Sequence, residues 1–272
     1  MMDKYQETFE KIKKLTEKKE YLSASKEMKQ LLEQLEQDLK GKKGTYFSFN
    51  HILEAYQYQY FKKPDKEPFF TEINIAAFYR FYGFILMHLN RIGESITAYE
   101  NALDWNPVDL DAFFQLSELY KKSGDLKHTK ETTLALYNYC CTRATMAHFY
   151  RNLGFYYLES YKPKIAIPLY IYSNIFYDTK QAHNELEYLS KALNQPIREY
   201  SIKELQAVLS GEQLPTGPNP DTIGITFRVG QLELELEHFS NAFDCFSMVY
   251  DLTQDKEAKE MVTMLKDKAD IN

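Results

Sequence analysis

Three cysteines and six histidines are the side chains of this chain whose chemistry is most often catalytic or metal-binding. Cys140 and Cys141 are adjacent, and they would form a reactive pair if their thiols were activated. Their position at the end of an expected helix favours buried packing instead. The histidines are dispersed and none pairs with another at metal-ligand spacing: His51, His88, His128, His148, His183 and His238. The sequence therefore predicts no metal site.

Motifs that bind phosphate or carry a nucleophile are also missing from the sequence. It contains no G-x-x-x-x-G-K-[ST], no G-x-G-x-x-G and no G-x-S-x-G. The glycine- and proline-rich stretch "TGPNPD" has no lysine and no evident helix start that would cradle a phosphate. We expect it to form an irregular surface loop. The Tyr and Phe stripes are expected to be core. No cofactor is predicted, and the sequence favours a protein that is not an enzyme.

Composition and charge point to helices and narrow the class of partner. Tyr (22) and Phe (18) are abundant, whereas Gly (10) and Pro (9) are few, which favours helices packed through aromatic side chains. Residues 201–272 carry 6 Lys/Arg against 13 Asp/Glu, a formal charge of −7 that disfavours nucleic acid. No run approaches about 20 apolar residues, so no membrane association is expected. The odd number of cysteines favours a reduced, cytoplasmic protein.

A spacing of small and aromatic residues recurs along the chain. Three glycines are each followed sixteen residues later by an aromatic residue: Gly83 and Tyr99, Gly154 and Tyr170, Gly230 and Phe246. A second small residue stands twelve positions after each glycine: Ser95, Ala166 and Ala242. Small residues let two backbones approach, and large ones fill the space between them. The spacing therefore predicts antiparallel helix pairs, repeated along the chain.

This frame resembles the tetratricopeptide repeat, whose 34-residue pattern is W-x2-L-G-x2-Y…A-x3-F…P. The best unit has Tyr79-x2-Tyr82-Gly83-x2-Leu86, then Ala102 and Pro107. The resemblance implies an all-α fold, a right-handed α-solenoid of antiparallel helix pairs with a C-terminal capping helix, in a single domain 1–272. Its expected parts are irregular N-terminal helices (1–75), repeats (76–109, 110–146 and 147–180), a degenerate repeat with a loop (181–222), a further repeat (223–256) and the capping helix (257–272).

The resemblance also implies where such a protein binds, because the first helix of each repeat lines a concave groove. Carried over unit by unit, the groove positions are Arg80, Phe84, His88, Gln115, Glu118, Arg151, Asn152, Phe155 and Arg228. The three arginines stand at or next to equivalent positions, where they would grip the carboxylates and backbone of an extended peptide. The alternative is that they pair with neighbouring glutamates of the chain itself.

These observations favour a non-enzymatic scaffold that binds a protein or an extended peptide in the groove. One alternative is a peptide-responsive regulatory protein whose superhelix changes shape when a ligand binds. Another is an enzyme built on a helical scaffold, although no constellation of residues argues for it. The exposed aromatic content is compatible with a homodimer.

Overall fold

The computed structural model describes residues 2–41 and 43–269 of the 272-residue chain. Within these residues the chain is mostly helical, with two strands of two residues each. It forms two compact units, residues 1–125 and 126–272. The predicted all-α fold class is confirmed. The single domain, the repeat boundaries and the superhelix hand that the sequence predicts involve the whole chain, including its ends at residues 1 and 270–272, and they stay predictions.

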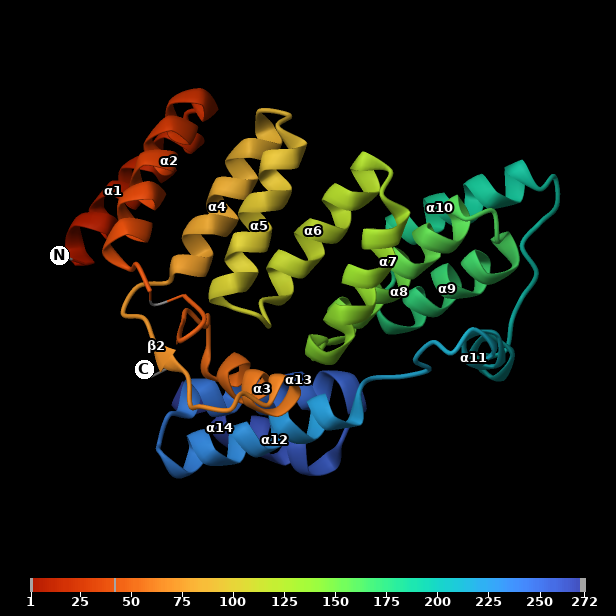
Figure 1. Cartoon of the computed structure of the whole chain (residues 1–272). Helices are drawn as coiled ribbons and strands as arrows, with labels where there is room; N and C mark the ends of the chain where they lie inside the picture. Colours follow the sequence, from red (N-terminus) through yellow and green to blue (C-terminus); the bar gives the residue numbers. More distant parts are fainter. Residues whose placement is uncertain (1, 42, 270–272) are drawn as a thin grey trace. The chain divides into compact units, whose positions relative to one another are not determined.

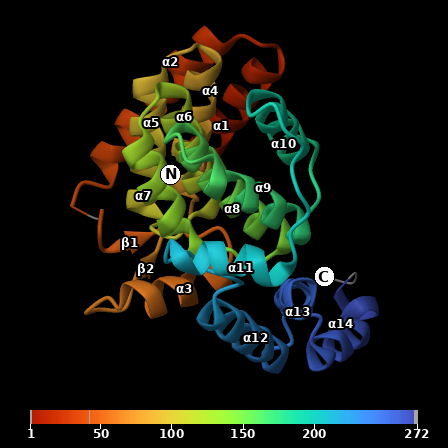
Figure 2. The same ribbon diagram turned by 90° about the vertical axis from the view of Figure 1, so that its right-hand side faces the viewer.

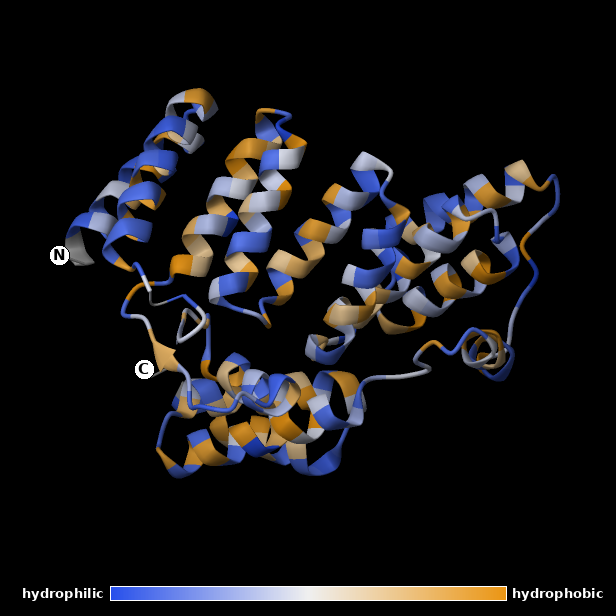
Figure 3. Cartoon of the chain, viewed as in Figure 1, coloured by the Kyte–Doolittle hydropathy of each residue, from blue (hydrophilic) through white to orange (hydrophobic). Residues whose placement is uncertain are grey.

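The first unit consists of helix pairs with one irregular connection (Figure 1). Its elements, in chain order, are α1 (Met2–Glu17), α2 (Tyr21–Asp38), β1 (Tyr46–Phe47), α3 (Ile52–Lys62), β2 (Phe69–Phe70), α4 (Ile75–His88), α5 (Ile92–Trp105) and α6 (Leu110–Ser123). Helices α1 and α2 pack together, α2 packs on α4, and α4 and α5 form the most extensive pair of this unit. Hydrophilic residues predominate along α1 and α2, whereas α4 carries more hydrophobic ones (Figure 3).

The second unit begins with a short helix and ends with a three-helix group (Figure 2). Its elements are α7 (Leu126–Leu136), the 3-10 helix η1 (Tyr137–Tyr139), α8 (Arg143–Glu159), α9 (Pro163–Phe176), α10 (Lys180–Ala192), α11 (Ile202–Gly211), α12 (Pro220–Glu235), α13 (Phe239–Thr253) and α14 (Lys256–Ala269). Helices α8 and α9 form its most extensive pair. Both α10 and α11 pack against α9. Helix α14 covers α13, with Leu265 packed against Ala242 and Phe246.

The glycine–aromatic spacing predicted from the sequence is confirmed in three helix pairs. A Cβ atom at the glycine would meet the ring of the aromatic residue sixteen positions later in each pair: Gly83 and Tyr99, Gly154 and Tyr170, Gly230 and Phe246. Close approach of the two helices therefore depends on the missing side chain. In the α4–α5 pair the small residue twelve positions after the glycine also joins the two helices, because Ser95 Oγ donates to the carbonyl of Gly83 at 2.8 Å.

The turn inside these pairs also repeats. Seven residues after each glycine, a residue adopts a left-handed backbone conformation: Asn90 (φ 56°), Tyr161 (φ 57°) and Glu237 (φ 60°). The next amide bonds back across the turn at 2.9 Å in each pair: Arg91 to Leu86, Lys162 to Tyr157, and His238 to Glu233. This is the usual way for a helix to end when its last carbonyls need partners. The α1–α2 turn has the same geometry, with Lys19 at φ 61° and the amide of Glu20 bonded to the carbonyl of Leu15. The helix before this turn has no signature glycine.

The connection between α2 and α4 folds back onto the unit. Strands β1 and β2 pair in parallel, with Tyr46 opposite Phe69. The amide of Ser48 donates to the carbonyl of Trp105 at 2.8 Å, which ties the connection to the end of α5. The aromatic stripe of residues 46–61 thus forms β1 and most of α3, and it packs in part against itself, as in the contact of Phe47 with Tyr58.

Among residues 2–41 and 43–269, no helix has both the length and the apolar character needed to cross a lipid bilayer.

Candidate functional site

Three predicted groove residues lie along one face of α4. Arg80, Phe84 and His88 follow each other at four-residue spacing, so they share a stripe on the helix surface. Phe84 is 37% exposed, and its ring meets that of His88 edge-on at 4.5 Å between centroids. The His88 ring stacks on Tyr21 of α2 at 4.3 Å. We call Tyr21, Phe81, Phe84 and His88 the α4 aromatic surface, because Phe81 stacks on Phe84 as well.

Arg80, by contrast, is engaged within the chain. Its Nε lies 3.2 Å from Oδ2 of the fully buried Asp109, and its Nη1 lies 2.8 Å from Oδ2 of Asp111. Its Nη2 donates to Oδ1 of Asn50 at 2.9 Å. This is intramolecular pairing of the kind that the sequence left open as the alternative to gripping a peptide, with aspartates in place of glutamates.

Two partners of Arg80, the exposed Asn50 and the buried Asp109, belong to a polar network that joins α3, α4 and α6. Glu54 on α3 accepts from the amide of Asn50 at 2.6 Å and from Nδ2 of Asn106 at 2.7 Å. Asp109 caps α6 by accepting from the amide of Ala112 at 3.0 Å. Burial raises the pKa of the Asp109 carboxyl to about 6, although the charge of Arg80 opposes this shift. The network therefore fixes the connection between α2 and α4 against α4, the end of α5 and the start of α6.

The other predicted site residues have different surroundings. Gln115 and Glu118 are half-buried on α6 of the first unit, where Glu118 forms an ion pair with Lys121 at 2.6 Å. On α8 of the second unit, Phe155 is half-buried and Asn152 is 0% exposed. Asn152 thus does not line an exposed surface, and it packs in the interior because it falls on the buried face of α8.

The three arginines do not share one environment. Arg80 is paired with aspartates, and the Nε and Nη1 atoms of Arg151 on α8 are buried. Arg228 on α12 is exposed, and its guanidinium lies 3.1 Å from Oε1 of Gln231 and 3.9 Å from Glu235 on the same helix. The common groove predicted for these residues spans both units and stays a prediction.

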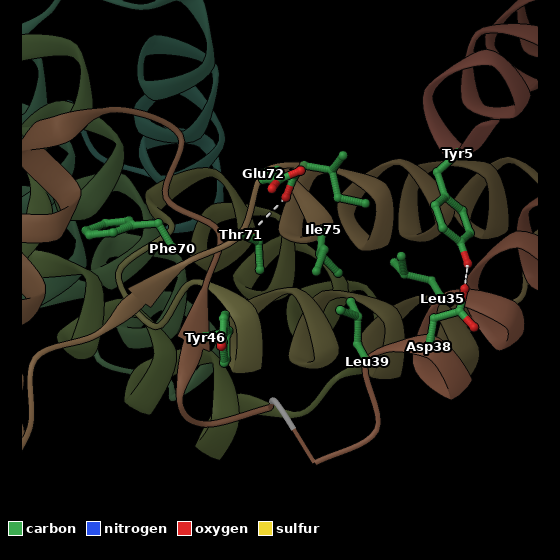
Figure 4. Close-up of a pocket in the computed structure, with 10 residues that line it drawn as sticks. Tyr5, Leu35, Asp38, Leu39, Tyr46, Phe70, Thr71, Glu72 and Ile75 are labelled. Atoms are coloured by element: carbon green, nitrogen blue, oxygen red, sulfur yellow. Dashed lines mark hydrogen bonds between the residues drawn. The ribbon is translucent and has the colours of Figure 1, made fainter. Parts of the chain in front are cut away.

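A cavity of about 230 Å³ opens in the first unit between α1, α2 and the segment after β2. Leu35, Leu39 and Ile75 contribute apolar side chains to it (Figure 4). The hydroxyl of Tyr5 donates to the carboxylate of Asp38 at one side. Asp38, Thr71 and Glu72 add polar groups to the otherwise mostly apolar lining.

Metal-binding and thiol chemistry have little support in the described part of the chain. No group of three or more His, Cys, Asp or Glu side chains within residues 2–41 and 43–269 is arranged to hold a metal ion. Cys140 and Cys245 are buried free thiols. Burial raises the pKa of Cys140 well above its usual range and that of Cys245 to about 12. Both thiols are therefore protonated and poor nucleophiles at neutral pH.

Sequence reasoning missed a set of tyrosine hydroxyls in the second unit. The sequence predicts only that the Tyr and Phe stripes are core and that "TGPNPD" is an irregular surface loop. In the structure the rings of Tyr150 and Tyr172 are buried, but their hydroxyls and that of Tyr137 bond to the backbone at residues 215–217. The only signal in the sequence was the coincidence of many tyrosines with a proline-rich segment, which does not say that they meet.

The repeated turn and the glycine–aromatic contacts build antiparallel helix pairs, an arrangement similar to that of the tetratricopeptide repeat. Twelve chains of solved structures match the protein. One is YrrB, described as a TPR protein with an unusual peptide-binding site. The match covers 70% of this chain and 92% of YrrB, at 16% sequence identity and a TM-score of 0.37. No protein-family model and no curated protein sequence matches the chain.

Proposed function

We propose that this protein is a non-enzymatic scaffold that binds a protein or an extended peptide, and that the α4 aromatic surface is a principal contact site. The observation that carries the proposal is the exposed ring pair of Phe84 and His88 on α4. Exposed aromatic side chains gathered on one face are typical of surfaces that bind other proteins.

The rings of this surface are held in place before a partner arrives. His88 is fixed between Tyr21 and Phe84, while Phe81 rests edge-on against Phe9 of α1 at 5.2 Å. A preorganised aromatic surface loses little conformational entropy on binding, which raises its affinity for a matching apolar side chain. The expected partner therefore presents an aromatic or branched aliphatic residue to α4.

Other parts of the chain support the same class of partner. The formal charge of −7 over residues 201–272 disfavours nucleic acid and anionic membranes. Cys140, Cys141 and Cys245 form no disulfide with one another, which is consistent with a reducing, cytoplasmic setting. Binding without catalysis is the simpler role for a surface built from Phe and Tyr rings and one imidazole.

The test uses the full chain to select peptides from a random displayed library, followed by fluorescence anisotropy on the selected peptides. We expect the variants Phe84→Ala and His88→Ala to raise the Kd of those peptides at least about tenfold, as for a buried aromatic contact at an interface. Tyr188→Ala serves as the matched control, because Tyr188 is an exposed ring on α10, outside the surface. If no selected peptide depends on Phe84 or His88, the proposed site is wrong.

A further inference from the structure

The segment of residues 212–219 joins α11 to α12. Side chains of the second unit hydrogen-bond to its backbone in the way that a binding site holds a separate peptide. Three consecutive carbonyls accept hydrogen bonds from three tyrosine hydroxyls. Tyr150 of α8 donates to Pro215 at 3.0 Å, Tyr172 of α9 donates to Thr216, and Tyr137 of η1 donates to Gly217 at 2.9 Å. The donors thus come from three different elements and converge on one short stretch of backbone.

The hydroxyls are fixed by the packing of their rings. Tyr150 meets Tyr172 edge-on at 4.9 Å and stacks on Phe176 at 5.4 Å. The ring of Tyr137 lies 5.2 Å from that of Phe149. Burial raises the pKa of Tyr137 to about 12 and also raises that of Tyr150, so both hydroxyls are proton donors at neutral pH. We call Tyr137, Tyr150 and Tyr172 the tyrosine cluster.

The segment itself has the composition of a ligand for such a surface. Its sequence, followed by Pro220, is "EQLPTGPNP", and its prolines have no amide hydrogen to satisfy. Only carbonyls are left to find partners at Pro215 and Pro218, and hydroxyl donors on an aromatic surface are suited to them. Proline-containing extended peptides are recognised on aromatic surfaces for this reason, and because their stiffness lowers the entropy lost on binding.

The two ends of the segment are anchored separately. Leu214 is buried, and the hydroxyl of Tyr157 donates to Glu212 at 3.1 Å. At the other end, Asn219 donates to Oδ1 of Asn138 at 2.9 Å and caps α12. Residues 215–218 are half-buried between these anchors. Backbone carbonyls are therefore what the tyrosine cluster binds, and any extended proline-containing chain offers the same groups.

We propose that the tyrosine cluster is a binding surface for a proline-containing extended peptide of another chain, and that residues 212–219 occupy it in the free protein. This surface belongs to the second unit and does not rest on the function proposed for the α4 aromatic surface. A tethered segment has an effective concentration on the order of millimolar, so it outcompetes a free peptide of equal intrinsic affinity at micromolar concentration. A partner binds when its own contacts exceed that advantage.

The experiment compares full-length variants by fluorescence anisotropy. The probe is a fluorescein-labelled peptide with the sequence of residues 212–220. The variant Pro215→Ser/Pro218→Ser keeps the length of the segment and its carbonyls but removes its stiffness. We expect it to bind the probe with a half-saturation concentration at least about tenfold lower than that of the wild type. Adding Tyr137→Phe and Tyr172→Phe, which keep the rings and remove two hydroxyls, is expected to abolish that gain.

Two controls make the result decisive. A probe with alanine at its three prolines is expected to bind the serine variant several-fold more weakly. Tyr188→Ala, at an exposed ring on α10 outside the tyrosine cluster, is expected to leave probe binding unchanged. Circular dichroism checks that each variant is folded, and Pro218→Ser alone replaces the double variant if that one unfolds. If a folded serine variant binds the probe no better than the wild type, or if the Tyr→Phe changes leave binding intact, the proposal is wrong.

Discussion

A Cβ atom placed on Gly83 would lie 2.5 Å from Cε2 of Tyr99. Tyr99 is buried, so its ring has little room to retreat. The same relationship is looser at Gly154 and Tyr170, where the nearest ring atom would be 3.0 Å away, and at Gly230 and Phe246, where it would be 3.1 Å away. Three helix pairs of this protein therefore require a residue without a side chain at the same position, and the space left for a Cβ differs among the three.

The first prediction concerns Gly83→Ala. Overpacking against Tyr99 is expected to lower the free energy of unfolding by about 1–3 kcal/mol, even though alanine favours a helix by about 1 kcal/mol. Urea unfolding measures the change. Gly224→Ala is the control, because nothing lies within 4 Å of a Cβ at Gly224 on α12, and we expect it to stabilise the protein by about 0.5–1 kcal/mol. A Gly83→Ala protein as stable as the wild type would contradict the packing described.

The second prediction concerns the turn between α8 and α9. Tyr161 has a left-handed backbone at φ 57°, and the residue is 93% exposed. Packing of its side chain therefore does not offset the cost of this backbone conformation. Tyr161→Gly is expected to raise the free energy of unfolding by about 1 kcal/mol, because glycine adopts this conformation without steric cost. Thermal and urea unfolding measure it. Tyr161→Ala retains the Cβ and should give no such gain; equal stabilisation by both substitutions would argue against the conformational cause.

The third prediction concerns the pH dependence of stability at Asp109. Burial raises the pKa of this carboxyl from 3.8 to about 6 in the folded protein. Between these values the folded state binds more protons than the unfolded state. The stability linked to this group is thus fully present below pH 3.8 and is lost as the pH rises through 6.

Asp109→Asn isolates this contribution, since asparagine caps a helix equally well and does not titrate. Between pH 4 and pH 7, we expect the unfolding free energy of the wild type to fall by about 1–3 kcal/mol relative to that of the variant. The comparison subtracts every pH-dependent contribution that the two proteins share. A constant difference across this range would show that Asp109 titrates alike in both states.

The fourth prediction concerns the thiols. Cys140 and Cys245 are buried with raised pKa values, and Cys141 is half-buried. In the native protein at pH 8, a disulfide reagent such as DTNB is expected to modify at most Cys141 quickly, and to reach the other two only at the rate of unfolding. The guanidinium-unfolded chain should give three thiols at once. Rapid modification of two or more thiols in the native protein would refute the burial described.

Whether the sequence predicts a contact depends on how far apart along the chain the two contacting residues lie. The pairing of Gly83 with Tyr99 was predictable, because both lie in one helix pair and the spacing recurs. The ion pair of Arg80 with Asp111 was not, since it depends on where the start of α6, which packs on α5, lies relative to Arg80. The hydrogen bond from Tyr137 to Gly217 was not predictable either, because 80 residues separate the two positions. The periodicity of the helix pairs does not extend through the irregular segment that contains Gly217.

The sixteen-residue spacing also limits where the chain can change length. Each spacing includes the turn between two helices, so an inserted or deleted residue in that turn would rotate the aromatic ring away from its glycine. Insertions and deletions should therefore be tolerated between helix pairs rather than within them, as in the long connection from α9 to α12, which contains both α10 and α11. The protein can thus vary in length while the contacts that close each pair stay constant.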